Sequence, residues 1–253
     1  MDLATQSTVE LAKNYGMGFQ SQLNSQIAEV EGLANGTNIQ NLVLENYNGV
    51  TLGNDSPYYT NVTDLFATAS DYAGNNVNYY LYDVNGYYIT SSDNTNTDDW
   101  QEHMAIPVED ITETKILQCS PLDEIESIDV VSPIIIKSQI VGLIRANITS
   151  RYFGSFIPED GSAFIMTNDG GYLFTSTGLT GQRELETQAF NCLNGADNAK
   201  DYGHLKASSF KNIYGFCKLS DSNWLYLIKQ QGTQYQQILA TLPITMSITL
   251  III

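Results

Sequence analysis

The sequence predicts an α+β fold in which a long N-terminal helix precedes two tandem lobes, each an antiparallel five-stranded sheet with flanking helices. Three observations predict it: an apolar stripe of helical period near the start, a β-hairpin pattern that occurs twice, and an uncharged apolar run at the end. With 253 residues, of which 43% are hydrophobic, the chain is long enough to bury a core in each of two lobes.

The N-terminal helix is predicted from apolar residues that recur at steps of three or four, the spacing of one helical face. They are Ala12, Tyr15, Phe19, Leu23, Ile27, Val30 and Ala34. Asn35-Gly36 ends the helix, because this pair accepts a left-handed backbone, and residues 1–37 are assigned to a stalk helix. The stripe either pairs two copies of the chain in a homodimer or covers the sheets of its own chain.

The internal repeat begins with two matching hairpin patterns. The run YLYDVNGYYITSS from Tyr80 aligns with FIMTNDGGYLFTST from Phe164, an offset of 84 residues. Each has an apolar run, a turn of Asn, Asp and Gly, and a second apolar run, which is typical of a β-hairpin. Further on, PIIIKSQIVGLIRANI from Pro133 resembles FCKLSDSNWLYLIKQ from Phe216 at nearly the same offset.

A short helix is expected between the hairpin and the later strands of each copy. DDWQEHMA from Asp98 opens with acidic residues ahead of an apolar face, as helix N-termini prefer, and RELETQAFNCL from Arg183 stands at the same place in the second copy. Hairpin, helix and three antiparallel strands build a five-stranded sheet with one face covered by helices. The two lobes are assigned to residues 38–153 and 154–232.

The chain ends on ILATLPITMSITLIII, residues Ile238 to Ile253, without a charge. This run is interpreted as a truncated membrane span, entered by a helix over 233–253; a buried C-terminal strand is the alternative. Met1 to Glu10 lacks the basic and apolar regions of a signal peptide, so an upstream span is expected in the natural protein. The residues between are expected on the extracytoplasmic side of a cell membrane.

This order of elements resembles the double Cache sensor domain, a tandem of PAS-like folds. The resemblance rests on four segments: Tyr82-Asp83-Val84-Asn85-Gly86, Asp98-Asp99-Trp100, Ser132-Pro133-Ile134 and Gly142-Leu143-Ile144-Arg145-Ala146-Asn147-Ile148. It implies the ligand-sensing domain of a bacterial membrane receptor: a chemoreceptor, a sensor histidine kinase or a cyclic-dinucleotide enzyme such as a diguanylate cyclase. A small molecule would bind the membrane-distal lobe, 38–153, without a cofactor. A protein-binding or adhesive ectodomain is the alternative.

Amino-acid sensors of that family carry Arg-x-Trp-Tyr at the helix start and an Asp in the last strand. This chain has Asp98, Trp100 and Gln101 at the first place and Asn147 at the second. Without the Arg, the chain lacks the guanidinium that would bind an α-carboxylate through two hydrogen bonds. With Asn in place of Asp, it lacks the negative charge that would bind an α-ammonium. The resemblance therefore places a typical amino-acid ligand in doubt.

The candidate ligand-binding residues gather in the 38–153 lobe. The Trp100 ring could stack on a ligand while its indole N–H donates a hydrogen bond, or it is an ordinary core tryptophan. Tyrosines and polar residues around the same face complete the set, although each could be structural or a solvated surface residue. The full set is Trp100, Tyr82, Tyr88, Asp99, Asp123, Asp129 and Asn147.

Charge and composition narrow the function further. A net charge of −17 with only 11 Lys and Arg would repel nucleic acid and anionic lipid headgroups, so no nucleic-acid partner is expected. The acidic stretch from Asp93 to Asp129 could draw a cation, but it lacks the calcium-loop pattern and no metal site is predicted.

His103 and His204 lie in no catalytic motif, so no catalytic residue is predicted. Cys192 and Cys217 are left open as a disulfide or as thiols.

Overall fold

The chain divides into two compact units, which are described separately. The first lobe comprises Ser21–Gly154, and the second lobe comprises Met1–Gln20 with Ser155–Ile253. The computed structural model describes residues 3–49, 56–93, 99–100, 106–118, 127–157, 162–174, 178–179, 181–195, 200–207 and 212–231. Residues 232–253, with the predicted membrane span, lie outside this description, as do Asp98, Gln101, His103 and Asp123.

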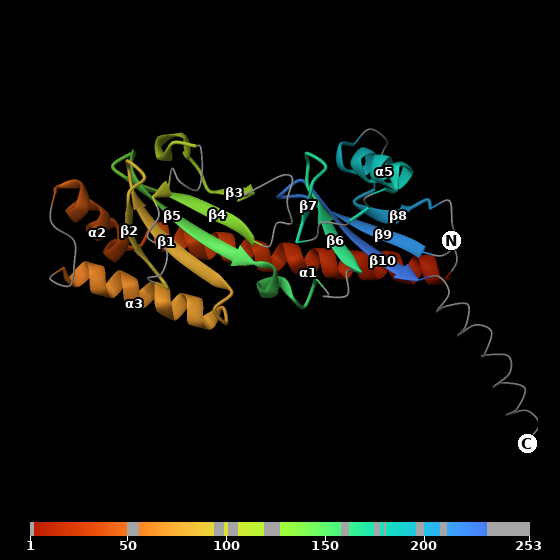
Figure 1. Cartoon of the computed structure of the whole chain (residues 1–253), viewed down its shortest axis with the longest axis horizontal. Coiled ribbons are helices and arrows are strands. Elements are labelled where there is room, and N and C mark those ends of the chain that lie inside the picture. The colour runs from red at the N-terminus through yellow and green to blue at the C-terminus, as the bar shows by residue number, and fades with distance from the viewer. Residues whose placement is uncertain are drawn as a thin grey trace, which may run out of the picture. The chain divides into compact units, whose positions relative to one another are not determined.

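The predicted N-terminal helix is present as α1 (Leu3–Ala34) (Figure 1). It ends at the predicted place, where the N–H of Asn35 donates to the Glu31 carbonyl at 3.1 Å. Phe19 and Leu23 of its apolar stripe are fully buried within the chain. The stripe therefore packs within its own chain, and a homodimer stays a prediction. No helix in the described ranges is long and apolar enough to cross a membrane.

The first lobe contains a five-stranded antiparallel sheet in the order β2-β1-β5-β4-β3. Its helix α3 begins where Ser56 accepts a hydrogen bond from the N–H of Tyr59 and Pro57 takes the first helical position. The elements are α2 (Thr37–Tyr47), α3 (Pro57–Tyr72), β1 (Val77–Asp83), β2 (Tyr88–Ser91), η1 (Val108–Asp110), β3 (Lys115–Gln118), β4 (Ser127–Ile136), β5 (Gln139–Thr149) and η2 (Ser150–Phe153).

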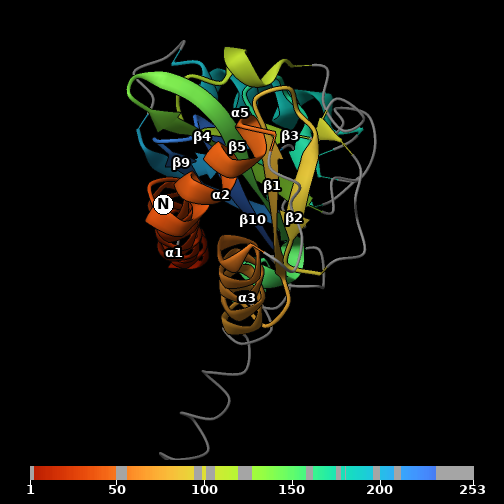
Figure 2. The same ribbon diagram turned by 90° about the vertical axis from the view of Figure 1, so that its left-hand side faces the viewer.

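The two faces of this sheet have different coverings, because neighbouring side chains of a strand point to opposite faces. On one face Tyr79 stacks on Phe66 of α3 at 5.8 Å, and its hydroxyl accepts a 2.7 Å hydrogen bond from Gln26 of α1. Figures 1 and 2 show α2 and α3 on this side. On the other face Tyr80 and Tyr82 belong to a buried cluster with Trp100 and Val108 of η1.

The second lobe repeats the strand arrangement of the first, in the order β7-β6-β10-β9-β8. The segments that begin at Tyr80 and Phe164 form the equivalent hairpins β1–β2 and β6–β7, and those from Pro133 and Phe216 form the equivalent β4–β5 and β9–β10. The predicted duplication is therefore confirmed. The elements are β6 (Ala163–Met166), β7 (Tyr172–Leu173), α5 (Arg183–Leu193), β8 (Tyr202–Leu205), β9 (Asn212–Leu219) and β10 (Trp224–Gln231).

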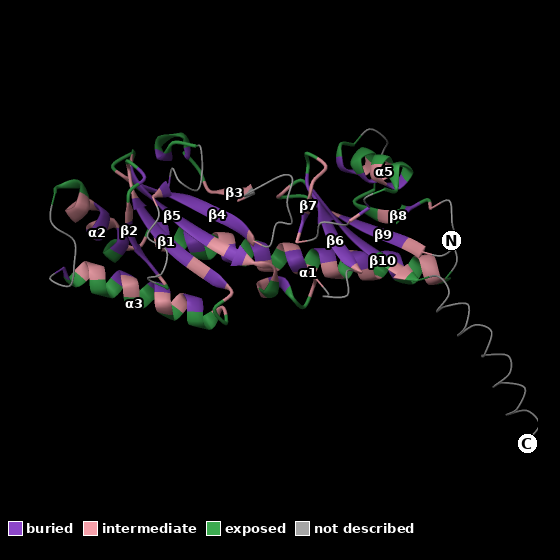
Figure 3. Cartoon of the chain, in the orientation of Figure 1, coloured by how far each residue is buried: buried purple, intermediate pink, exposed green. Residues whose placement is uncertain are grey.

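The core of the second lobe has helices on both faces of the sheet. Leu185, Ala189 and Leu193 of α5 pack on one face, and α1 approaches the other so closely that a Cβ on Gly215 would lie 2.6 Å from the Thr8 carbonyl oxygen. Figure 3 shows that the central strands are buried along most of their length. Within this lobe no disulfide joins Cys192 to Cys217, which settles that open point in favour of thiols.

Candidate functional site

The candidate site lies on the face of the first-lobe sheet opposite α2 and α3. Tyr80 and Tyr82 stand two apart on β1, and the register pairs them with Arg145 and Leu143 of β5. Side chains two residues apart share a face. The sheet therefore presents aromatic, cationic and aliphatic groups in adjacent rows.

An aromatic cluster forms one end of this face. The ring of Tyr82 meets that of Trp100 at 5.8 Å and that of Tyr88 at 6.5 Å, both edge to face. Such pairs contribute about 0.5–1.5 kcal/mol beyond their buried area. These three residues are thus held together as a rigid aromatic wall.

Hydrogen bonds tie Trp100 to the β1–β2 hairpin. Its backbone N–H donates to the Gly86 carbonyl at 2.7 Å, and Asp99 Oδ1 accepts from the N–H of Tyr88 at 2.9 Å. The indole N–H, which the sequence offers to a ligand, donates to the Ile106 carbonyl at 2.6 Å, and Trp100 is fully buried. Trp100 has the surroundings of a core tryptophan, and any ligand contact would involve its ring.

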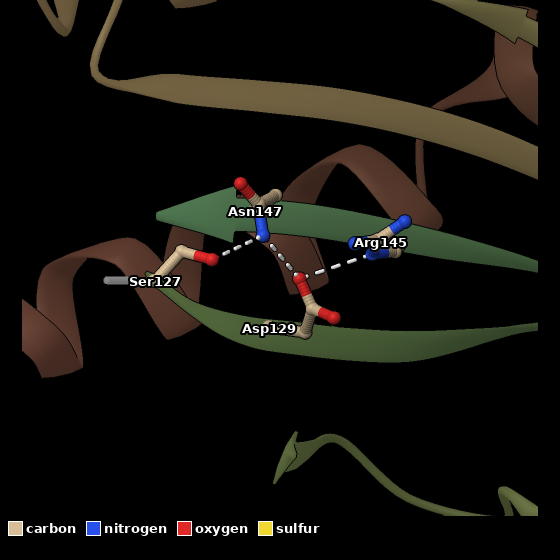
Figure 4. A network of polar contacts seen from close by, with 4 residues as sticks. All are labelled: Ser127, Asp129, Arg145 and Asn147. Carbon is tan, nitrogen blue, oxygen red and sulfur yellow. Dashed lines mark hydrogen bonds and ion pairs between the residues drawn. The ribbon is translucent and has the colours of Figure 1, made fainter. Parts of the chain in front are cut away.

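A polar network occupies the neighbouring part of the face (Figure 4). Asn147 Nδ2 donates to Asp129 Oδ1 at 2.8 Å and to Ser127 Oγ at 3.0 Å. The Nε of Arg145 lies 3.0 Å from the same Asp129 oxygen. Asp129 is 0% exposed and Arg145 6%, so this ion pair is almost completely removed from water.

Burial and charge set the protonation of this network. Burial disfavours the charged form of Arg145, but the adjacent Asp129 carboxylate outweighs it, so the pKa of the guanidinium is raised and the group stays charged. Burial raises the pKa of Tyr82 to about 12 although the charge of Arg145 acts in the opposite direction. Tyr82 is therefore a neutral hydrogen-bond donor at physiological pH.

Two donors on this face have no well-aligned acceptor. The Tyr82 hydroxyl and Arg145 Nη1 are both buried. The Tyr82 hydroxyl and the guanidinium interact with each other, which favours the ionised form of Tyr82 and the charged form of Arg145, but their contact does not have the geometry of an ordinary hydrogen bond, and neither atom makes such a bond with another residue that the structure describes. The guanidinium also lies over the ring of Tyr80, 5.0 Å from its centroid. A buried donor without an acceptor costs about 1–3 kcal/mol, so such groups in a native protein call for an explanation.

Six of the seven predicted site residues lie on or beside this face. Tyr82, Tyr88 and Trp100 come together, Asp99 bonds to the backbone of Tyr88, and Asp129 bonds to Asn147 across the strand pair. The seventh, Asp123, lies outside the described residues. Their role as ligand contacts stays a prediction.

Arg145 was missed by sequence reasoning. A signal for it existed: it is the one charge in the apolar run VGLIRANI and stands two residues before Asn147, hence on the same face. Amino-acid sensors carry an Arg and an Asp at their motif positions, which this chain lacks. The sheet of the 38–153 lobe has an Arg and an Asp on this face, Arg145 and Asp129, but these two are paired with each other. In the described ranges, no three His, Cys, Asp or Glu side chains gather as a metal site would require.

The sequence matches no protein-family model and no curated protein in the comparisons, whereas the fold matches solved structures along nearly its whole length. One is the ligand-binding domain of the Pseudomonas aeruginosa amino-acid chemoreceptor PctB with L-Arg (TM-score 0.58, 15% identity, 92% of this chain and 97% of that one). Another is the ligand-binding domain of the Pseudomonas fluorescens chemoreceptor CtaA with L-isoleucine (TM-score 0.58, 16% identity, coverage 92% and 94%). A third is the sensor domain of the V. cholerae histidine kinase DctB (TM-score 0.53, 12% identity, coverage 90% and 99%).

These similarities define the class by fold. The chain has the double Cache fold of chemoreceptor and histidine-kinase sensor domains, with a long helix followed by two PAS-like lobes. At identities of 12 to 16% the likeness concerns the fold and carries no ligand from those proteins to this one.

Proposed function

We propose that this chain is the extracytoplasmic ligand-sensing domain of a bacterial membrane signalling receptor, and that a small molecule binds the face formed by Tyr82, Trp100 and Arg145. The observation that carries the proposal is the buried Arg145–Asp129 pair beside two donors without aligned acceptors. A buried ion pair is often no more stabilising than apolar packing of the same volume. Its presence inside a sensor fold therefore favours a binding role.

The chemistry of this face indicates a ligand with acceptor oxygens. The Tyr82 hydroxyl and the Nη1 of Arg145 can each donate to a carboxylate or a carbonyl. The rings of Tyr80 and Tyr82 would flank its apolar part. Asp129 already accepts from Asn147 and Arg145, which disfavours its use for an α-ammonium. The proposed ligand is accordingly not a typical amino acid.

The receptor context is part of the proposal. The lobe of residues 38–153 would be membrane-distal, the lobe of 154–232 membrane-proximal, and residues 233–253 would enter the membrane. Output would come from a chemoreceptor, histidine-kinase or cyclic-dinucleotide module in the full-length protein. A ligand can drive such a switch only through different affinities for two conformations.

A melting-temperature screen tests the proposal, because a ligand that prefers the folded state raises the melting temperature. Metabolites containing carboxylate and carbonyl groups are screened against the wild type, and each hit is retested on Tyr82→Phe. We expect at least one hit, with an affinity roughly tenfold lower for the variant because a hydrogen bond to the ligand is lost. No hit in a broad set would contradict a small-molecule function and favour the alternative of a protein-binding ectodomain.

A further inference from the structure

The second lobe contains a cavity that the proposed site does not use. Its volume is about 370 Å³, within the range of about 300–1,000 Å³ that small-ligand pockets have. It is lined by residues of α1, of the end of α5, of β8 and the residue before it, of β9, of the β9–β10 turn and of the start of β10. All of these belong to the second lobe, so the cavity is formed within one compact unit.

The cavity has a local excess of positive charge in a strongly acidic protein. Lys13 and Lys218 line it together with one carboxylate, that of Asp201, although the chain has 28 acidic residues and 11 Lys and Arg. Among the residues that the structure describes, neither lysine forms an ion pair. Lys13 Nζ instead lies 4.6 Å from the ring centroid of Tyr202. The ammonium of Lys13 therefore remains available to an anion.

The inner wall of the cavity is apolar. Trp224 is 4% exposed and Leu219 1%. The Cys217 thiol also lines the cavity, and its pKa is raised chiefly by burial, with Asp201 adding to the effect and Lys13 opposing it. The ammonium of Lys13, beside Tyr202, and the buried wall thus border the same small space, which suits a molecule with an anionic end and a short apolar body.

We propose that this cavity is a second ligand site, which takes a small carboxylate. The carboxylate would pair with the ammonium of Lys13, and the apolar body would lie against Trp224 and Leu219. A charge-assisted hydrogen bond in such a place is about twice as strong as a neutral one. The site is separate in residues from the Tyr82–Arg145 face, so either can exist without the other.

Calorimetric titration with butyrate as the probe tests the ligand class. We expect butyrate to bind the wild type and Lys13→Gln to weaken binding roughly tenfold or more. Lys206→Gln, in the same lobe but outside the cavity, makes the same charge change and should bind butyrate as the wild type does. Equal binding by Lys13→Gln, or binding of butylamine as tight as that of butyrate, would overturn the proposal. Binding of 2-aminobutyrate would support it, with Asp201 near the ammonium.

The two tryptophans provide a test of location, because Trp224 lines the cavity and Trp100 lies in the first lobe. Their indole N–H signals are followed by ¹⁵N–¹H NMR during the butyrate titration and assigned with Trp224→Phe. We expect the Trp224 signal to shift and the Trp100 signal to stay. A shift of Trp100 alone would overturn the second site and instead support binding at the first. If neither tryptophan signal shifts, the second site is overturned. Binding at the Tyr82–Arg145 face is then tested by the melting-temperature screen alone.

Discussion

Arg145 and Asp129 are diagonal neighbours on adjacent strands: Asp129 pairs directly with Asn147, two residues beyond Arg145, and the Arg145 Nε lies 3.0 Å from Asp129 Oδ1. Both side chains are almost completely buried. The pair therefore has two separable consequences, one for stability and one for binding.

Removal of one partner should be strongly destabilising, because it leaves the other charge buried and alone. We expect Arg145→Gln to lower the free energy of unfolding of the first lobe by about 3–5 kcal/mol. The double variant Asp129→Leu/Arg145→Met should regain most of this loss but should not bind the ligand. Urea unfolding followed by circular dichroism measures the free energy of unfolding of each variant. Arg151→Gln, at an exposed arginine, is the control with an expected change within about 0.5 kcal/mol. A single variant as stable as the wild type would contradict the described burial.

Adjacent tyrosines on opposite faces of β1 should respond differently to loss of the hydroxyl. Tyr79→Phe removes a 2.7 Å hydrogen bond with Gln26, and we expect a loss of about 1 kcal/mol. Tyr82→Phe removes a buried hydroxyl whose contact with Arg145 is poorly aligned and which has no other partner among the described residues, so we expect a clearly smaller loss. Calorimetric melting of both variants makes the comparison. If Tyr82→Phe destabilises as much as Tyr79→Phe, the Tyr82 hydroxyl has a structural partner.

The contact of α1 with β9 should depend on the absence of a side chain at Gly215. An added Cβ would lie 2.6 Å from the Thr8 carbonyl oxygen, a backbone atom that cannot turn away. We expect Gly215→Ala to cost about 1–3 kcal/mol. Gly32→Ala is the matched control, since nothing lies within 4 Å of its Cβ position in α1 and alanine favours a helix by up to about 1 kcal/mol. Chemical denaturation should thus give opposite signs for the two substitutions.

The β4–β5 turn holds two residues in a conformation that favours glycine. Lys137 has φ 50° and Ser138 φ 65°, as in the two-residue turns that match the twist of a hairpin. We expect Ser138→Gly to raise the melting temperature, because the left-handed backbone costs a residue with a Cβ about 1 kcal/mol. Gln139→Gly, one residue later on an exposed position of β5, should lower it. A lower melting temperature for both would show that the turn has another backbone conformation.

Asp169 should show a pH effect in the β6–β7 hairpin. A hydrogen bond from the Thr167 hydroxyl, assisted by the N–H of Gly171, holds the pKa of Asp169 below its usual range. The stabilisation is therefore present above the ordinary aspartate pKa and is lost as the pH falls through the lowered one. Thr167→Val should move the NMR titration midpoint of the carboxyl upward. Thr187→Val, whose hydroxyl bonds to the Arg183 carbonyl, should leave it in place.

Much of the fold could be predicted because its signals are local. The apolar stripe of α1 lies within one helix, and each hairpin pattern lies within two neighbouring strands. The helix α5 begins at the expected Arg183 and ends at Leu193. The helices α2 and α3 were not located, although Ser56-Pro57 is a helix-start signal. Only Val62, Phe66 and Ser70 of α3 are buried, so its apolar stripe is short and weak.

The sequence by itself determined the duplicated unit, the long helix before it and the face on which Tyr82 and Asn147 lie, because side-chain periodicity within one element decides these features. Only the tertiary structure decided that Arg145 pairs with Asp129, that the indole N–H of Trp100 donates to the Ile106 carbonyl, and that Lys13 and Trp224 line the same cavity. These relationships depend on strand register and on contacts between residues far apart in the chain, whose energies arise only after folding brings the partners together.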